Sequence, residues 1–480
     1  MMSQVFSNPE LALALPEIFV LGAACLILLI DVFLSDRWRW VSYGLALLTL
    51  AGAAVLTLRD IPADRATAFF GMFVADPLSQ ILKVVTYGAV GAVFLYSREY
   101  LVRHRLFKGE FYVLGLSALL GVMVMSSAGS LLTIYLGIEL LALSFYALVA
   151  FDRDSGISAE AAIKYFVLGA IASGALLYGM SLIYGLTGTL DLSEIAVRLS
   201  APSSLGVTMG LVFIVVAVAF KLGAVPFHMW LPDVYEGAPT SVTLFIGTVP
   251  KLAYFALALR LLAQGLAGMS VEWTQMLAPL AVLTLVIGNV LAIVQTNLKR
   301  MLAYSTIANV GFIVLGFVAG TADGYAAALY YTLVYVLVAL GSFGVILLAS
   351  RKGYEADQLD DYRGLYRRDP LLAFAMMLLM FSTAGVPPLV GFWAKLRIFQ
   401  ALWETHHLWL VIIAAAMSVV GAYYYLRVIK LMYFDDPVGQ QPPASTPGGV
   451  RVALGLNAAA VLALGVLPQP LLNLCARLIH

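Results

Sequence analysis

The fold depends on the stretch of residues 130–151, which reads SLLTIYLGIELLALSFYALVAF. Only one residue in this stretch is charged, and that residue is Glu139. A helix needs about 20 mostly apolar residues to cross the hydrocarbon core of a bilayer. The stretch therefore predicts a membrane-spanning helix that carries one carboxyl group near its middle.

The whole chain shares this apolar character. Of its 480 residues, 62% are hydrophobic and only 11% are charged, whereas a soluble protein has about 25% charged residues. Most of the surface must therefore face lipid. The net charge of +1 gives no basic excess that would attract nucleic acid, so we expect a lipid bilayer as the surroundings and no nucleic-acid partner.

The two cysteines, Cys25 and Cys475, stand alone in apolar runs at opposite ends of the chain. Neither has a second cysteine or a histidine at the spacing that metal and iron–sulfur sites use. The sequence therefore predicts no metal centre and no cluster in this chain, and any redox chemistry is expected in other chains.

Apolar runs of membrane-spanning length occur about fourteen times, which predicts an all-α polytopic membrane protein. The predicted spans are residues 11–34, 38–58, 76–97, 111–127, 130–151, 160–185, 204–227, 240–264, 274–295, 301–320, 325–349, 371–402, 408–434 and 450–474. The first run is longer than the apolar part of a cleaved signal peptide, so we expect it to remain as the first helix.

Basic residues in the loops predict the orientation. With fourteen spans both termini lie on one side, and the loops on the other side hold about 17 lysines and arginines. The side of the termini holds only five, namely Arg59, Arg65, Arg198, Arg260 and Arg477. Because basic loops stay in the cytoplasm, we expect a bacterial inner-membrane protein with periplasmic termini.

Two proline breaks indicate an internal duplication. Residues 224–227 (AVPF) in the seventh span resemble residues 385–388 (GVPP) in the twelfth. An odd separation of five spans gives two copies of opposite orientation, as in transporters with inverted repeats. The predicted parts are three N-terminal helices (1–110), two inverted five-helix repeats with broken helices 7 and 12 (111–264 and 265–434), and a loop with the fourteenth helix (435–480).

Charges inside the predicted spans need an explanation because each costs several kcal/mol in hydrocarbon. The acidic residue in question is Glu139, and the basic ones are Lys164, Lys221, Lys251 and Lys395. One glutamate can neutralise only one of four lysines. A desolvated lysine holds its proton less tightly and can titrate near neutral pH. These residues therefore predict a proton relay, with a purely structural ion pair to Glu139 as the alternative.

Three further charged or titratable residues lie in or beside the predicted spans. His228 follows the first proline break and either passes protons between Lys221 and Lys251 or is a neutral histidine bound to a backbone carbonyl. Lys299, at the head of the tenth span, is either part of the relay or an anchor at the cytoplasmic surface. Lys83 lies about two turns into the third span, and we expect it to snorkel to the membrane surface.

The eleventh span contains three tyrosines at helical spacing, Tyr330, Tyr331 and Tyr335. Their hydroxyls could line a hydrated path, and Tyr330 is included among the candidate relay residues. Aromatic packing at helical spacing is the favoured alternative.

Three long motifs resemble one known family. They are residues 220–240 (FKLGAVPFHMWLPDVYEGAPT), 297–305 (NLKRMLAYS) and 385–395 (GVPPLVGFWAK). In this order they resemble the antiporter-like membrane subunits of respiratory complex I, NADH–quinone oxidoreductase, and the resemblance covers essentially the whole chain. The length resembles the shorter types of these subunits. The two shorter types differ at one position in the broken twelfth helix, where one typically has lysine and the other glutamate. With Lys395, this chain resembles the type that has lysine.

The resemblance implies proton translocation by Glu139, Lys221, Lys251 and Lys395, with further roles at Lys164 and His228. It implies a non-redox subunit of an enzyme complex, with NADH, FMN, iron–sulfur clusters and quinone held by partner subunits. The implied partners are other membrane-arm subunits, including another antiporter-like one. A cation/proton antiporter subunit is the alternative, and a structural spacer is a third hypothesis.

Overall fold

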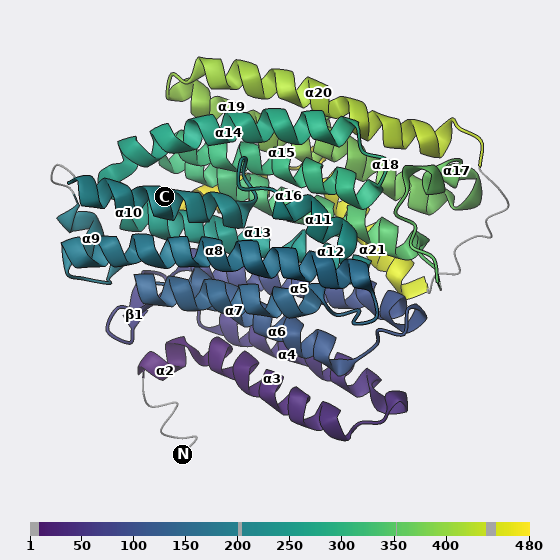
Figure 1. The fold of residues 1–480 in the computed structure, drawn as a ribbon, viewed down its shortest axis with the longest axis horizontal. Coiled ribbons are helices and arrows are strands. Elements are labelled where there is room, and N and C mark those ends of the chain that lie inside the picture. The colour runs from purple at the N-terminus through teal and green to yellow at the C-terminus, as the bar shows by residue number, and fades with distance from the viewer. Residues whose placement is uncertain (1–8, 200–203, 352, 438–447) are drawn as a thin grey trace.

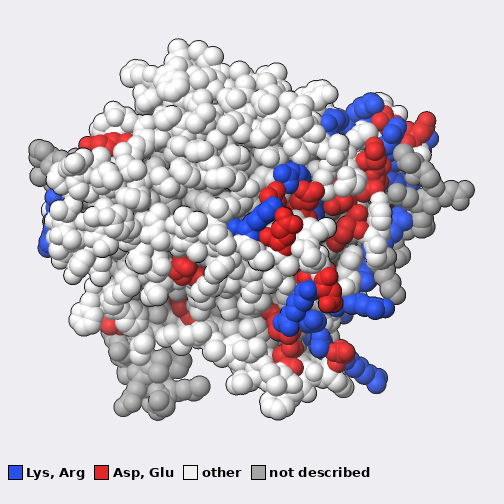
Figure 2. All heavy atoms as spheres, viewed as in Figure 1, with Lys and Arg blue, Asp and Glu red and all other residues white. Residues whose placement is uncertain are grey.

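The structure is a computed structural model that describes residues 9–199, 204–351, 353–437 and 448–480. Its helices lie side by side along one direction, so the molecule has two ends where the loops gather (Figure 1). Figure 2 shows lysine, arginine and acidic side chains crowded at one end, with a broad uncharged surface beside them. A membrane protein has this form because only uncharged surface can face hydrocarbon.

Thirteen helical stretches in the described part of the chain are long and apolar enough to cross a membrane. Their elements are α3 (Leu15–Phe33), α4 (Trp40–Arg59), α5 (Pro77–Arg103), α6 (Gly109–Ser126), α7 (Leu131–Val149), α8 (Gly156–Thr187), α10 (Leu205–Leu222), α12 (Thr240–Ile246) with α13 (Val249–Leu257) and the π-helix η2 (Ala258–Gly265), α14 (Ser270–Ile293), α15 (Leu298–Val318), α16 (Ala322–Ala349), α20 (Leu408–Tyr433) and α21 (Gly448–Val466). The remaining predicted span is the broken pair α18 (Pro370–Ala384) and α19 (Val390–Glu404). The prediction of an all-α polytopic protein with about fourteen spans is confirmed.

Short elements at the helix ends were not predicted. They are α2 (Pro9–Leu13), η1 (Asp36–Trp38), the antiparallel pair β1 (Ala66–Ala68) and β2 (Phe73–Ala75), α9 (Leu192–Arg198), α11 (Trp230–Gly237), η3 (Ala267–Met269), η4 (Leu359–Tyr362), α17 (Leu365–Arg368) and α22 (Gln469–Ile479). The last predicted span, 450–474, was wrong at its end. The helix stops before Pro468, which has no N–H to continue it, and α22 is a separate helix that packs against α16.

The middle of the molecule is formed by α12 to η2, α15 and α16. The first two of these stretches are completely enclosed by other helices and α16 nearly so, whereas α3, α20 and α21 expose most of their surface. The exposed side chains on these outer helices include Leu29, Val32, Val419 and Leu456. Any polar group on the central helices must therefore find its partners inside the protein.

Small residues allow the closest helix pairs to form. A Cβ on Gly121 of α6 would lie 2.7 Å from the backbone nitrogen of Leu141 on α7, and Gly179 of α8 faces the backbone oxygen of Gly210 on α10 at the same distance. Without a hydrophobic force between helices in lipid, such close backbone approach is what holds membrane helices together.

Both broken helices stop in the same way. α10 ends at Gly223 with φ of 84°, and α18 ends at Gly385 with φ of 89°. In each case the glycine N–H and the next N–H donate to one carbonyl of the last helical turn, which is a Schellman motif. The structural match is therefore Gly223 with Gly385, one residue away from the pairing of Ala224 with Gly385 in the sequence comparison. The inverted-repeat organisation and the four-part division stay predictions.

Two cations inside the membrane region have carboxylate partners. Lys83 does not snorkel as predicted, because its side chain is fully buried with Nζ 2.6 Å from an Oε of Glu17. Arg260, which the sequence placed in a loop, is also buried, and it binds both carboxylate oxygens of Asp76 at 2.7 and 2.8 Å. Burial alone would raise the pKa of Asp76, but the Arg260 guanidinium and the Ser79 N–H hold this pKa below its ordinary value. Both pairs join helices that are distant in sequence.

The Glu17–Lys83 pair predicts a stability test. Replacement of one partner leaves a buried charge without compensation, which costs on the order of 3–5 kcal/mol. We expect Lys83→Met to lower the melting temperature of the detergent-solubilised protein, and Glu17→Gln/Lys83→Met to restore most of the loss. A double variant that melts as low as the single one would show that the pairing is not what stabilises this site.

The orientation can be tested with cysteine labelling in a Cys25→Ser/Cys475→Ser background. Arg153 and Arg65 are both exposed, at opposite ends of the molecule. We expect a membrane-impermeant maleimide to label Arg153→Cys in inverted vesicles and Arg65→Cys only in intact spheroplasts, because basic loops stay in the cytoplasm. The reverse pattern would place the termini in the cytoplasm.

Candidate functional site

Lys221 and Glu139 are brought together in the first half of the molecule. Lys221 is buried in the last turn of α10, and its Nζ donates a hydrogen bond to Ser173 Oγ of α8 at 3.1 Å. Glu139 of α7 is half-buried and lies within electrostatic reach of this ammonium group. In the described part of the chain no direct ion pair joins the two, and Oε1 of Glu139 has no hydrogen-bond partner. The carboxylate is thus close enough to influence Lys221 without being bound to it.

Lys251 lies at the start of α13, next to the first helix break. It is buried, and its Nζ donates to the backbone oxygen of Leu222 at 3.2 Å. Leu222 is the last residue of α10, where helical carbonyls have no partner within the helix and the helix dipole is negative. The end of a helix inside the membrane therefore supplies the counter-charge for this lysine.

Lys395 has the same arrangement at the second break. Its Nζ donates to the backbone oxygen of Ala384, the last residue of α18, at 2.9 Å. The ring of Phe312 also faces this ammonium group, 5.2 Å from ring centre to Nζ. By geometry the counterpart of Lys395 is thus Lys251, since each binds the final carbonyl before a break.

Lys299 also binds the end of a helix. It lies in the first turn of α15, is 3% exposed, and donates to the backbone oxygen of Ala238 just after α11, at 3.0 Å. A lysine that anchors a helix at the membrane surface would have its ammonium group in water. Of the two interpretations offered by the sequence, the geometry favours a place in the interior polar network.

Hydrogen-bonding side chains on α15 lead from Lys299 toward the second half. Thr306 Oγ lies 2.7 Å from the hydroxyl of Tyr335, and the Asn309 side-chain oxygen accepts from the hydroxyl of Tyr331 at 2.7 Å. These two tyrosines of α16 are therefore polar partners and not only aromatic packing, contrary to the favoured interpretation. The polar residues of α15 were missed, although polar positions on one face of an apolar helix are a readable signal.

A small cavity connects this line of side chains to Lys395. It has a volume of about 20 Å³ and lies between α15, α16, α18 and α19. Its lining includes Asn309, Tyr331, Ser382, Thr383 and Lys395. A space of this size holds about one water molecule, and the Asn309–Tyr331 pair and Lys395 lie in the wall of this one cavity.

Three candidate residues lie outside this line. Lys164 was expected inside the membrane, but it is exposed and forms ion pairs with Glu160 and Asp233, both at 2.9 Å. Lys164 lies about two turns into α8, which begins at Gly156, and its role in proton translocation stays a prediction. His228 lies half-buried between α10 and α11, and among the described residues no hydrogen bond joins it to the relay lysines.

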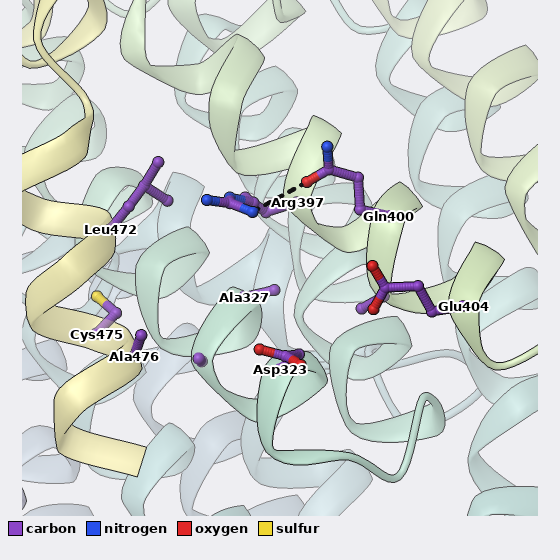
Figure 3. A pocket seen from close by; sticks show the side chains of 10 residues that line it. Asp323, Ala327, Arg397, Gln400, Glu404, Leu472, Cys475 and Ala476 are labelled. Carbon is purple, nitrogen blue, oxygen red and sulfur yellow. Dashed lines mark hydrogen bonds between the residues drawn. The ribbon is translucent and has the colours of Figure 1, made fainter. Parts of the chain in front are cut away.

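Tyr330 faces a different part of the molecule from its neighbour Tyr331. Its hydroxyl is buried without a hydrogen-bond partner among the described residues, and the nearest charged groups include Arg397. Arg397 lines a cavity of about 170 Å³ at the end opposite the charged one, with Asp323, Gln400 and Glu404 (Figure 3). Arg397 lies on α19, the helix that follows the second break.

No group of three or more histidine, cysteine, aspartate or glutamate residues in the described part of the chain could hold a metal ion. The location of the redox groups in other chains stays a prediction.

Comparison with known proteins identifies the family. The family model "NADH:quinone oxidoreductase/Mrp antiporter, TM" matches residues 128–421, more than half of the chain. NADH-quinone oxidoreductase subunit N of Thiobacillus denitrificans is 56% identical, over 100% of this chain and 99% of that protein. The protein of the same name from Thioalkalivibrio sulfidiphilus is 54% identical, over 98% of each.

Solved structures agree with this result. A chain of respiratory complex I from Thermus thermophilus matches with a TM-score of 0.83 and 33% identity, over 96% of this chain and 99% of that chain. A chain of the Mrp complex from Dietzia sp. matches with a TM-score of 0.87 over 98% of this chain and 97% of that chain, but at 21% identity the likeness shows the fold alone. This chain therefore belongs to the NADH:quinone oxidoreductase/Mrp antiporter transmembrane family, alongside the proteins named NADH-quinone oxidoreductase subunit N.

Proposed function

We propose that this chain is a proton-translocating membrane subunit of a bacterial NADH-quinone oxidoreductase, respiratory complex I. The observation that carries the proposal is the set of three buried lysines whose hydrogen-bond partners are neutral. Lys221 binds a hydroxyl, and Lys251 and Lys395 bind backbone carbonyls. In a low dielectric a charged group with neutral partners can release its proton at little cost, whereas one paired with a carboxylate cannot.

The proposed path runs through the centre of the molecule. Protons enter from the charged end near Lys221 and Lys251, which Glu139 influences through its charge. They cross to Lys395 along the polar side chains of α15 and the small cavity beside Asn309, and leave through the polar cavity around Arg397. Tyr330 and His228 lie beside this path, and Lys164 acts only at its exposed mouth.

The energy for transport comes from other subunits. We place NADH, FMN, the iron–sulfur clusters and quinone in those partners, which makes this chain a non-redox part of the enzyme. The exposed apolar faces of α3, α20 and α21 suit lipid and neighbouring membrane-arm subunits, including another antiporter-like one. The matching Schellman ends of α10 and α18 support two inverted five-helix repeats. The excess of basic residues in the loops away from the termini supports both termini in the periplasm.

A cation/proton antiporter subunit is the second candidate, and the matching family model, whose description also names the Mrp antiporter, favours it. The relatives at more than 50% identity are named for NADH-quinone oxidoreductase, which supports the first proposal. Sodium-ion transport by liposomes that contain this chain alone would favour the antiporter.

The relay predicts that single lysine variants uncouple the enzyme. We expect Lys221→Met and Lys395→Met to abolish NADH-driven acidification of inverted vesicles, because methionine keeps the volume but binds no proton. The assembled complex should persist on native gels. Lys430→Met is the control, since Lys430 is exposed and paired with Asp435. Normal pumping by both buried-lysine variants would leave the chain a structural spacer.

Glu139→Gln tests the role of the carboxylate near Lys221. Glutamine keeps the size of the side chain and removes its charge, so Lys221 loses the electrostatic interaction that favours its protonated form. We expect a large loss of pumping with the complex still assembled, measured in the same vesicles.

The line of side chains on α15 predicts a difference between two buried threonines. Thr306 reaches Tyr335 on the neighbouring helix, whereas Thr332 bonds only the Ala328 carbonyl of its own helix. We expect Thr306→Val to slow pumping by about a hundredfold, at the lower end of the range for loss of a proton-transferring group, and Thr332→Val to leave it unchanged. Equal rates in the two variants would remove Thr306 from the path.

A further inference from the structure

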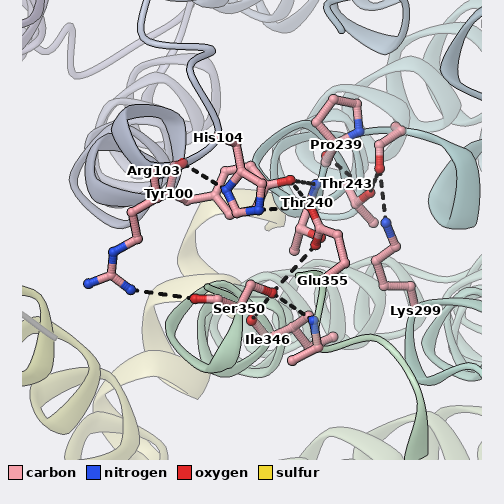
Figure 4. Close-up of polar contacts among 12 residues, drawn as sticks. Tyr100, Arg103, His104, Pro239, Thr240, Thr243, Lys299, Ile346, Ser350 and Glu355 are labelled. Carbon is pink, nitrogen blue, oxygen red and sulfur yellow. Dashed lines mark hydrogen bonds and ion pairs between the residues drawn. The ribbon is translucent and has the colours of Figure 1, made fainter. Parts of the chain in front are cut away.

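A second cluster of polar side chains lies at the charged end of the molecule, where four elements meet (Figure 4). Its members come from the end of α5, the start of α12, the start of α15 and the segment that follows α16, and they are Tyr100, His104, Thr240, Lys299, Ser350 and Glu355. The path described above does not use this cluster, apart from Lys299.

Glu355 is the centre of the cluster. The hydroxyl of Tyr100 donates to its Oε1, and the hydroxyl of Thr240 donates to its Oε2 at 2.7 Å. Ser350 Oγ is 3.4 Å from the same Oε2. The side chain is one-third exposed while Tyr100 and Thr240 are buried. Glu355 therefore sits between water and the interior, with hydroxyls on its inner side.

His104 is placed to exchange a proton with Glu355. Its Nε2 lies 3.8 Å from Glu355 Oε1 and has no hydrogen-bond partner in the described part of the chain. The other ring nitrogen, Nδ1, is 3.0 Å from the Tyr100 backbone oxygen, and the imidazole stacks on the Tyr100 ring at 4.1 Å. The backbone oxygen and the stacking fix the ring so that its free nitrogen faces the carboxylate.

Lys299 lies on the inner side of the same cluster. Figure 4 shows the turn that contains Thr240 between His104 on one side and Lys299 on the other. Lys299 and Thr243 both donate to the Ala238 oxygen, two residues before Thr240. Several carboxylates lie within electrostatic reach of this ammonium group, and Glu355 interacts with it most strongly. The charge on Glu355 and the proton on Lys299 therefore influence each other.

Other charged and titratable groups in the described part of the chain also lie around the cluster. They include Arg103 of α5, which bonds the Ser350 backbone oxygen, Glu236 of α11, and Asp357 and Tyr362 of the segment after α16. Arg103 pairs with Glu99 at 3.2 Å, and within the described residues the cation that lies beside the Glu355 carboxylate is a protonated His104.

We propose that His104 and Glu355 form a proton-uptake site that loads Lys299. His104 Nε2 takes one proton from water and passes it to Glu355 Oε1. The acid then donates through the hydroxyl of Thr240, and the neutral amine of Lys299 gains one proton as the carboxylate and the neutral imidazole are restored. The proposal rests on the proposed function and adds a third inlet, at the junction of the two halves, to those near Lys221 and Lys251.

The test is the pH profile of NADH-driven proton pumping in inverted vesicles. Glutamine at position 355 can still bond both hydroxyls, because its oxygen accepts from one and its NH2 group donates to the oxygen of the other. Glu355→Gln therefore separates a proton site from a structural tether. Without the carboxylate, His104 cannot pass its proton on to Lys299, so a higher proton concentration is needed for Lys299 to be loaded by another route. We expect the profile to shift toward acid by about one pH unit, so that pumping at pH 8 falls about tenfold. His104→Gln should shift it in the same direction.

Asp360→Asn is the matched control, because Asp360 lies in the same segment, is exposed and does not touch the cluster. It should keep the profile of the unmodified complex. If Glu355→Gln fails to assemble, His104→Gln carries the test, because it leaves the hydrogen bonds of Glu355 in place. An unchanged profile in the assembled variants overturns the inference, while Lys221→Met would still abolish pumping. Normal pumping by Lys221→Met would instead overturn the proposed function.

Discussion

The structure depends on positive side chains bound to the carbonyl ends of helices, two of which stop inside the membrane. A helix end leaves up to four carbonyls without partners and carries the negative end of the helix dipole. In hydrocarbon such groups cost several kcal/mol each unless they are satisfied. Lys251 binds the end of α10, Lys299 the end of α11, and Lys395 the end of α18. The break and the charge therefore stabilise each other, and removal of either leaves the other without a partner.

The identity of the partner separates structural cations from those suited to carry protons. Lys83 and Arg260 bind carboxylates directly and join distant helices. Their positive charge neutralises a buried carboxylate, and loss of a proton from the cation would leave that carboxylate as an uncompensated buried anion. Lys221, Lys251 and Lys395 have hydroxyl or carbonyl partners, which remain neutral when the lysine does. The same residue type thus serves two purposes in one membrane, and the nearest acceptor decides which.

The connection between the two halves belongs to the central helices. α15 is enclosed on all sides, so its polar side chains must pair within the protein. Thr306 and Asn309 do so through tyrosines of α16, and the resulting line ends beside Lys395. At the charged end, Glu355 ties the segment after α16 to α5 and α12. Both features place titratable groups of one half beside the helices of the other.

The sequence by itself determined the membrane class, the number of spans, and the positions of Glu139, Lys221, Lys251 and Lys395, because apolar runs and the charges within them are local properties of the chain. Burial and partners were decided only by the tertiary structure. Lys164 and Lys83 lie at similar depths in their helices, yet the first is exposed and the second fully buried. Tyr330 and Tyr331 are neighbours in sequence, yet of the two only Tyr331 lines the cavity beside Lys395, since successive residues point about 100° apart around a helix. Which face of a helix meets another helix depends on the packing of all of them, and no local pattern contains that information.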